Sequence, residues 1–215
     1  VMRDVGPAVG LAAALLAREN PLEPMVILWS DHLVKKDALF RKILLASGSI
    51  VTKEQDRIVF VAQKARFASE NLGWINFGKE TKNTDGVSFH SFVDFQYRPD
   101  AKTAKQYFES GHHAWNLGYF VTTPKFLLSL YETFVPNVYK GISQIAETWH
   151  TDAFNKTLED VYPTLEKISF DNAILEKLNP ANAYVVSENI EWSDIGAWEA
   201  LKEALEESKD KNVTQ

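Results

Sequence analysis

The chain has 215 residues, no cysteine and a formal net charge of −6. A chain of this length can bury a sizeable core. The lack of cysteine excludes a disulfide scaffold and any thiolate metal site or nucleophile, and it fits a cytoplasmic location, which we predict. The negative charge argues against nucleic acid as the main partner. Because the longest apolar stretch, residues 9–17, is too short to cross a bilayer, we expect no membrane-spanning segment.

Helical and extended segments alternate over the first third of the chain. Apolar periodicity and turn residues predict a helix at 8–18, a strand at 25–28, a helix at 35–46 and a strand at 57–62. An α–β–α–β order of this kind favours an α/β fold with a mixed, mainly parallel sheet flanked by helices.

The rest of the chain begins with short aromatic segments. These and the later periodic runs predict strands at 73–77, 86–89, 91–95, 115–122 and 183–186, and helices at 101–110, 125–134, 137–161, 171–177 and 199–207. On the helical stretch 137–161, the candidate core positions are Ile142, Ile145, Trp149, Phe154, Leu158 and Val161. No repeat or linker divides the sequence, so we expect residues 1–215 to form a single domain.

Two carboxylates follow predicted strands in the same local context. Asp31 and Asp194 each come directly after a Trp-Ser pair. In an open α/β sheet, ligands bind beyond the carboxyl ends of the strands. A carboxylate held there can bind a metal ion or a sugar hydroxyl, and the alternative is a helix cap or turn residue. The repeated context favours the functional interpretation.

Several short motifs carry a resemblance to a known family. In chain order they are Gly6-Pro7-Ala8, Trp29-Ser30-Asp31-His32, Tyr97-Arg98-Pro99, Trp115-Asn116-Leu117-Gly118, Phe170-Asp171-Asn172 and Trp192-Ser193-Asp194-Ile195-Gly196-Ala197-Trp198. This order and spacing resemble the sugar-1-phosphate nucleotidyltransferases, most closely the mannose-1-phosphate guanylyltransferases, over about residues 4–205. The pair of motifs built on Trp115-Asn116 and Trp192–Trp198 is the most specific part of the likeness.

The resemblance implies the nucleotidyltransferase fold and a reaction in which GTP and mannose 1-phosphate give GDP-mannose and pyrophosphate. It also implies a role for each matching residue. Asp31 and Asp194 would hold Mg²⁺, and Arg98 would pair with phosphate. The substrate-binding residues would be Gly6, Pro7, Gly73, Tyr97, Asn116, Gly118 and Asp171. Two alternatives stay open, because Asn116 could instead bond its own backbone and Asp171 could be a helix N-cap. We expect a supporting role for His32 rather than proton transfer.

The chain also departs from the family pattern. The glycine-rich loop that cradles the triphosphate in the family would precede these motifs, so we expect the 215-residue chain to be N-terminally incomplete and inactive alone. The family's Glu-Lys-Pro is Tyr97-Arg98-Pro99 here, and its Thr-Gly-Tyr-Gly keeps only Gly73. These losses favour an alternative, a catalytically inactive binding or regulatory subunit. A related glycosyltransferase ranks last, since the sequence has no Asp-x-Asp. A homodimer stays open.

Overall fold

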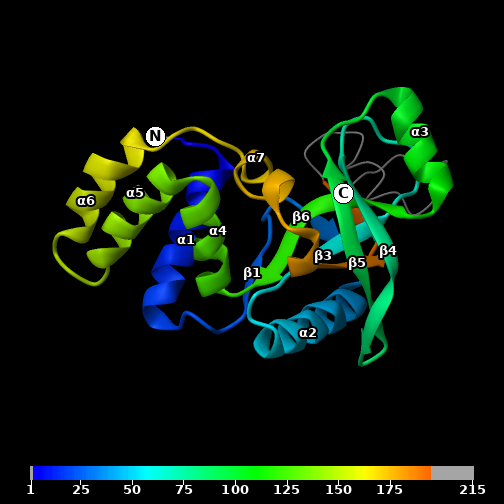
Figure 1. The fold of residues 1–215 in the computed structure, drawn as a ribbon, viewed down its shortest axis with the longest axis horizontal. Helices are drawn as coiled ribbons and strands as arrows, with labels where there is room; N and C mark the ends of the chain where they lie inside the picture. The colour runs from blue at the N-terminus through cyan, green and yellow to red at the C-terminus, as the bar shows by residue number, and fades with distance from the viewer. Residues whose placement is uncertain (1, 195–215) are drawn as a thin grey trace, which may run out of the picture.

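The structure is a computed structural model that describes residues 2–194 (Figure 1). The helices are α1 (Val5–Glu19), α2 (Asp37–Lys53), α3 (Ala101–Ser110), α4 (Pro124–Phe134), α5 (Pro136–Glu147), α6 (Phe154–Val161) and α7 (Phe170–Ala173), with short 3₁₀ turns η1 (Tyr162–Thr164), η2 (Leu175–Lys177) and η3 (Pro180–Asn182). The strands are β1 (Met25–Ile27), β2 (Leu33–Val34), β3 (Ile58–Lys64), β4 (Gly73–Thr84), β5 (Val87–Gln96), β6 (His113–Thr122), β7 (Ala183–Glu188) and β8 (Trp192–Ser193). The predicted helix at 199–207 lies outside the described residues.

The main sheet has the strand order β1-β6-β3-β7-β5-β4, and β4 also pairs with the first half of β6. The predicted α/β class with a mixed sheet flanked by helices is confirmed. The expected predominance of parallel pairing is corrected, because among the described strands of this sheet β3 and β7 alone pair in parallel. The strands β1 and β3 do run in the same direction, but the antiparallel strand β6 lies between them.

Some predicted elements differ in extent from the observed ones. The middle segments form one long antiparallel hairpin, β4–β5, whose register shifts at bulges. The helix predicted over 137–161 is two helices, α5 and α6, and His150 between them has a left-handed φ of 64°. A residue in that conformation cannot continue a right-handed helix, so the chain turns there.

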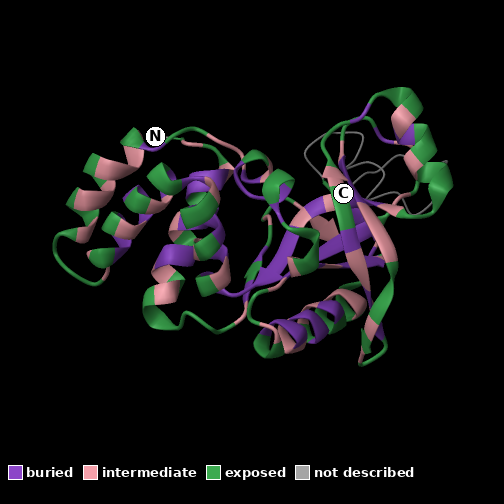
Figure 2. Ribbon diagram, in the orientation of Figure 1, coloured by how far each residue is buried: buried purple, intermediate pink, exposed green. Residues whose placement is uncertain are grey.

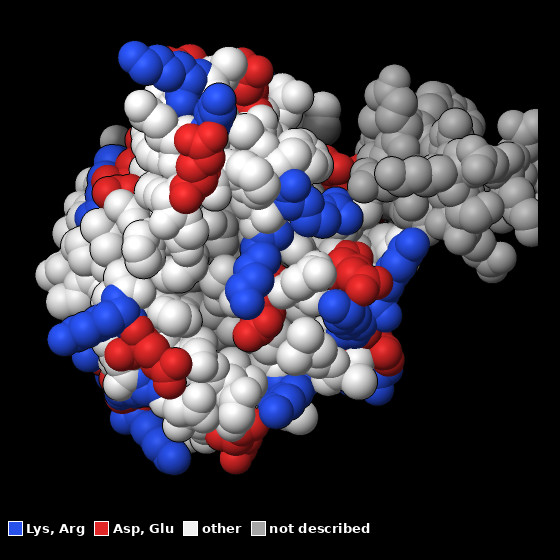
Figure 3. Space-filling model, turned by 90° about the vertical axis from the view of Figure 1, so that its right-hand side faces the viewer, with Lys and Arg blue, Asp and Glu red and all other residues white. Residues whose placement is uncertain are grey.

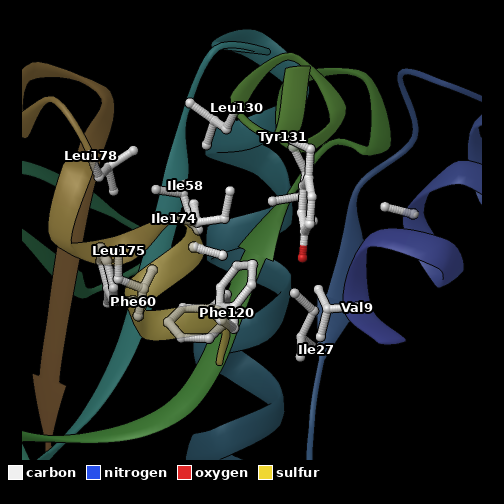
Figure 4. Packing of buried hydrophobic residues seen from close by; sticks show 14 of the residues in the cluster. Val9, Ile27, Ile58, Phe60, Phe120, Leu130, Tyr131, Ile174, Leu175 and Leu178 are labelled. Carbon is white, nitrogen blue, oxygen red and sulfur yellow. The ribbon is translucent and has the colours of Figure 1, made fainter. Parts of the chain in front are cut away.

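The core occupies both faces of the sheet. On β3, Ile58 and Phe60 face a cluster formed with α1, α4 and α7, while Val59 and Val61 face a second cluster formed with α2. This alternation follows from the two-residue period of a strand. All four side chains are essentially fully buried, and the sheet centre is buried throughout (Figure 2). Figure 4 shows the first cluster, in which Phe60 and Phe120 lie close to Ile174.

A layer of helices covers one face of the sheet. Helix α1 packs against α4 and α5, and the buried Tyr131 hydroxyl of α4 donates a 2.5 Å hydrogen bond to the Gly6 carbonyl. Helix α6 lies outermost, beside α5 (Figure 1). The core prediction for 137–161 is therefore right for Ile142 and Ile145, which are buried. It is wrong for the later positions, which are partly exposed because, within residues 2–194, no further layer of helices covers α6 and the turn before it; these are Trp149, Phe154, Leu158 and Val161.

The opposite end of the molecule carries charges of both signs. Figure 3 shows this side, where lysine and arginine side chains lie beside aspartate and glutamate side chains. On the elements nearby, Lys105 pairs with Glu109 on α3, and Lys82 of β4 pairs with Glu54 at the end of α2. These four charges are therefore neutralised locally. Within residues 2–194, no helix combines the length and apolar character needed to cross a bilayer.

Candidate functional site

A cavity of about 530 Å³ gathers most of the predicted site residues. Seven of the ten line it, namely Asp31, Gly73, Tyr97, Asn116, Gly118, Asp171 and Asp194. Asp4, Trp29, His32, Asn71, Phe120, Ser169 and Trp192 are among the other lining residues. Residues far apart in the sequence therefore meet in one place, as the resemblance implied.

A short two-stranded ribbon brings Asp31 and Asp194 together. Strands β2 and β8 pair antiparallel, with Leu33 opposite Ser193. Continuing this register places His32 and Asp194 at the next positions, with Asp31 one residue beyond. Both carboxylates favour the protonated form of His32, as groups close to its ring would. Asp31 is not a helix cap, since the N-cap residue of α2 is Lys36, but it does lie in a turn, at residues 30–31.

His32 is held by two neighbours at the base of the ribbon. The indole Nε1–H of Trp192 donates to His32 Nδ1 at 3.1 Å, and the Tyr119 hydroxyl lies 3.1 Å from the same nitrogen. An indole can only donate, so Nδ1 carries a lone pair and the neutral ring is protonated on Nε2. Burial lowers the pKa of His32, although Asp31 and Asp194 oppose this, and burial raises the pKa of Tyr119 to about 12. A neutral, fixed imidazole supports the ribbon.

A bulge in β6 places Asn116 and Gly118 in the wall of the cavity. Val61 of β3 pairs with Tyr119, but the next residue, Ala62, pairs with Asn116, so two residues of β6 are extra. Gly118 has a φ of +71°, and a Cβ there would overlap Trp29 Nε1, so the position requires glycine. The Gly118 N–H donates to Asn116 Oδ1 at 3.0 Å, which leaves the Asn116 amide N–H₂ as the group that faces the cavity. The backbone-bonding interpretation of Asn116 is thus correct for its oxygen.

Asp171 is part of the cavity wall rather than a cap. The N-cap of α7 is Ser169, whose side chain accepts from the Asn172 N–H at 3.1 Å. Asp171 faces Asn116, with Asn116 Nδ2 and Asp171 Oδ1 3.5 Å apart. Burial raises the pKa of the Asp171 carboxyl, with smaller contributions from Glu176 and Asp4. A half-buried carboxylate with a single long hydrogen bond to another side chain is available to accept bonds from ligand hydroxyls.

Arg98 stands at the rim of the cavity. Its Nε donates to the Asn71 carbonyl at 3.2 Å, and its guanidinium lies 5.0 Å from the centre of the Tyr97 ring. Both of these partners line the cavity, although Arg98 itself does not. The cavity walls carry the carboxylates of Asp4, Asp31, Asp171 and Asp194 but, among the lining residues that the structure describes, no lysine or arginine. Arg98 is therefore placed to supply positive charge at the entrance.

Gly6, Pro7 and Gly73 allow close packing around the cavity. Gly6 and Pro7 are buried in the first turn of α1 and do not line the cavity. A Cβ on Gly6 would come within 2.5 Å of the Ile168 carbonyl oxygen, which the Gly6 N–H bonds at 3.0 Å. Gly73 does line the cavity, and a Cβ there would come within 2.8 Å of the Phe95 ring. Their contribution to the site is close packing of the segments around it.

The sequence did not single out Trp29, Asp4 or Tyr119 as site residues. Trp29 packs against Gly118 and belongs to the same Trp-Ser-Asp motif as Asp31, which was the available signal. Asp4 adopts a left-handed φ of 67° and bonds the Val5 N–H at 2.7 Å. Tyr119 contacts His32 only because β6 passes under the ribbon, and no local pattern indicates this.

Comparison with known proteins agrees with this geometry. The family model described as Nucleotidyl transferase matches residues 2–211. The chain belongs to the nucleotidyltransferase family. It is 30% identical over 220 residues to a mannose-1-phosphate guanylyltransferase of Salmonella montevideo, covering 100% of this chain and 45% of that protein. It is also 30% identical over 202 residues to the alginate biosynthesis protein AlgA of Pseudomonas fluorescens, covering 93% of this chain and 40% of that protein.

A solved structure shows the same fold. The crystal structure of a protein named mannose-1-phosphate geranyltransferase, from Thermus thermophilus, superposes with a TM-score of 0.83 at 25% identity. The match covers 99% of this chain and 58% of that chain. The nucleotidyltransferase chain thus spans less than half the length of the relatives named above, and about three fifths of this structural neighbour.

Proposed function

We propose that the full-length protein transfers a guanylyl group from GTP to mannose 1-phosphate, giving GDP-mannose and pyrophosphate. The observation that carries the proposal is the β2–β8 ribbon, which presents Asp31 and Asp194 in a cavity that also holds Asn116 and Asp171. The names of the 30% identical relative and of the structural neighbour support mannose 1-phosphate as the sugar substrate.

The two carboxylates are suited to a hard divalent cation. Within residues 2–194, neither Asp31 nor Asp194 makes a hydrogen bond or an ion pair, and both are exposed to the cavity. Mg²⁺ takes oxygen ligands and commonly uses one or two carboxylates together with substrate phosphates. Asp31 and Asp194 would therefore hold Mg²⁺ in this protein. When bound, the ion would supply positive charge against the phosphates in a cavity that is otherwise acidic.

The reaction requires positioning more than covalent catalysis. A phosphate oxygen of mannose 1-phosphate forms a bond to the α-phosphorus of GTP as the bond to the β-phosphate oxygen breaks, and pyrophosphate leaves. The attacking oxygen is already ionised, so no general base is needed. Asn116 Nδ2 and the Asp171 carboxylate would bind sugar hydroxyls, and Arg98 would pair with phosphate at the rim. Holding two reactants in line in this way lowers the entropic part of the barrier.

The test is pyrophosphate release by the full-length protein with Mg²⁺. Five nucleoside triphosphates (GTP, ATP, UTP, CTP and dTTP) are each paired with mannose 1-phosphate and with glucose 1-phosphate. Release with GTP and mannose 1-phosphate is expected, and release with another pair would correct the substrates. The Tyr97-Arg98-Pro99 departure favours one other outcome. A folded protein that releases no pyrophosphate but is thermally stabilised by these ligands would be a binding subunit.

The role of Asp194 is tested by Asp194→Asn in the full-length protein. We expect kcat to fall by roughly 10²–10³-fold, as when an electrostatic stabiliser is removed, with an unchanged melting temperature because the side chain is exposed. Asp152→Asn, an exposed acid in the turn between α5 and α6, is the matched control and should retain full activity. Loss of stability with little loss of activity would remove Asp194 from the metal pair.

A further inference from the structure

Gln63, near the carboxyl end of β3, is a buried polar residue that the proposed reaction does not use. Its side chain is completely buried, whereas the β3 residues before it, from Ile58 to Ala62, are apolar. Burying an amide costs free energy unless its polar atoms are hydrogen-bonded. An unpaired amide here would destabilise the sheet, so its partners are informative.

The Gln63 amide makes four hydrogen bonds. Nε2 donates to the Lys64 carbonyl at 2.8 Å and to Asn189 Oδ1 at 3.0 Å. Oε1 accepts from the N–H groups of Ile190 at 3.1 Å and Trp192 at 3.3 Å. A primary amide has two N–H donors and two lone pairs, so every one of its bonding positions is used. Three of the four partners lie in residues 189–192, which a single residue, Ser193, separates from Asp194.

These bonds fix the backbone that forms the ribbon. Glu191, between the two bonded N–H groups, has a left-handed φ of 54°, which allows both groups to reach the same oxygen. The carbonyls of Ile190 and Glu191 accept from the N–H groups of Lys36 and Lys35 at 3.2 and 3.3 Å. Segment 189–192 is therefore bonded to Gln63 on one side and to the chain that follows β2 on the other.

We infer that Gln63 is the positioning residue that sets the register of the β2–β8 ribbon, and with it the placement of Asp194 beside Asp31. This inference rests on the proposed function, in which that pair holds a divalent cation. Successive side chains of a strand point to opposite faces, so a slip of one residue would turn Asp194 away from the cavity. Gln63 itself touches neither carboxylate and acts through segment 189–192.

The direct test is amide hydrogen exchange in the full-length protein. Gln63→Met keeps a side chain of similar length and removes all four bonds. We expect faster exchange at the Ile190 and Trp192 amides, relative to the wild type. Asn189→Ala is a milder second variant. Asn189 is exposed, and the change removes one of the four bonds to Gln63 together with the bond that Asn189 Oδ1 accepts from the Glu191 N–H at 3.2 Å. It should produce a smaller change in the same direction.

Thr122→Val is the matched control. Thr122 is also completely buried, and its hydroxyl bonds the Arg57 carbonyl at 2.8 Å, outside the ribbon. This variant loses a buried hydrogen bond without touching segment 189–192, so exchange at Ile190 and Trp192 should stay near the wild-type rate. Unchanged exchange in Gln63→Met would overturn the inference.

Metal binding tests the consequence for the carboxylates. Mn²⁺ serves as the probe, with free Mn²⁺ followed by electron paramagnetic resonance in the absence of substrates. We expect Gln63→Met to weaken Mn²⁺ affinity about 10–100-fold, the usual effect of residues that orient metal ligands. Thr122→Val should bind as the wild type does. In the pyrophosphate-release assay, Gln63→Met should lower kcat and leave the KM for the sugar phosphate within about twofold of the wild-type value. The reason is that Asn116 and Asp171, which would bind the sugar, lie on other elements.

The outcomes separate the two proposals. A wild-type protein that releases no pyrophosphate contradicts the proposed function, while amide exchange and Mn²⁺ binding still decide the role of Gln63. Equal Mn²⁺ affinity in Gln63→Met and the wild type, or no Mn²⁺ binding by the wild type, would overturn the positioning role even if pyrophosphate is released. Faster exchange together with weaker Mn²⁺ binding would support it.

Discussion

The effect of Arg98 on the KM for the sugar phosphate can be separated into the effect of its charge and the effect of its planar shape. It lies at the rim of an acidic cavity, and its backbone adopts a left-handed φ of 44°. We expect Arg98→Ala to raise the KM for the sugar phosphate about tenfold, on the order of 1.4 kcal/mol, because the cation that we propose pairs with the phosphate is lost. Steady-state kinetics of pyrophosphate release measure this change.

Two further variants show whether a change in KM comes from the charge of Arg98 or from its shape. Arg98→Lys keeps the charge but not the planar fork, so a KM near the wild-type value would assign the effect to charge alone. Arg41→Ala removes an exposed arginine of α2 that pairs with Asp37, away from the cavity, and should leave the KM unchanged. A wild-type KM in Arg98→Ala would place Arg98 outside the binding site.

We expect the Asp171 carboxylate to lower the stability of the folded protein at neutral pH, although we propose that it contributes to binding of the sugar phosphate. Burial raises its folded-state pKa above the unfolded value of 3.8, so the folded protein binds the proton more tightly. Stability is therefore lost as pH rises from the unfolded pKa through the folded pKa, and the full penalty is present at pH 7. Asp171→Asn removes the charge and should raise the melting temperature at pH 7 by about 2–4 °C.

The pH dependence distinguishes this cause from better packing. The stabilisation by Asp171→Asn should disappear below pH 3.8, where the wild-type carboxyl is protonated in both states. Thermal melts from pH 3 to pH 8, with Asp152→Asn as an exposed control, measure this. A stabilisation that does not change with pH would reject the electrostatic explanation. The same variant should raise the KM for the sugar phosphate, because Asp171 lines the cavity.

The residue types of the site could be predicted because they lie in short motifs. Asp31, Asn116 and Asp194 stand in short motifs that also contain tryptophan or glycine, and a motif survives as a local pattern. Gln63 could not be predicted, because three of its four partners are 126 to 129 residues away along the chain. A buried glutamine at the end of an apolar strand has no local signature until its partners are placed. Gly6 belonged to a motif, yet its role is close packing against Ile168.

At the scale of elements, the order was predictable and the pairing was not. Helix 101–110 was predicted at its observed limits, because Asp100 caps it and Gly111 ends it. The position of β6 between β1 and β3 depends on contacts between residues 50 to 97 positions apart along the chain. The bulge in β6 likewise follows from tertiary pairing, and Gly118 was its one local indication.

Packing between helices can be tested with two glycines in helix interiors. A Cβ on Gly10 of α1 would come within 2.7 Å of the Tyr131 ring and 2.9 Å of Ile142 Cδ1. Gly10→Ala should therefore destabilise the fold by about 1–3 kcal/mol, as overpacking does. A Cβ on Gly48 of α2 would meet only Pro24 Cβ, at 3.9 Å. Gly48→Ala should stabilise by about 0.5–1 kcal/mol, because alanine favours the helix.

Urea unfolding of both variants measures these free energies. The two substitutions are chemically identical, so the difference between them reports the space around each helix. Destabilisation by Gly48→Ala, or a neutral Gly10→Ala, would contradict the described packing of α1 and α2.

At the scale of the molecule, the cavity joins the two cores. Phe120 and Phe170 of its wall belong to the core under α1 and α4, while Leu117 and Trp192 belong to the core under α2. Trp29 packs against both. A ligand in the cavity contacts residues anchored in each core, so its binding energy should be shared by both faces of the sheet.

Native-state hydrogen exchange can detect this coupling. Ala13 of α1 and Ala46 of α2 are buried on opposite faces of the sheet and report one core each. A saturating sugar phosphate, at about 100 times its Kd, should raise the opening free energy by about 2.7 kcal/mol. Since the ligand binds only when both halves of the cavity are formed, we expect the same increase at both amides. Asp171→Asn, which weakens binding, should reduce the two increases together. Protection that rises at one alanine alone would show that the cores open independently and that the cavity depends on one of them.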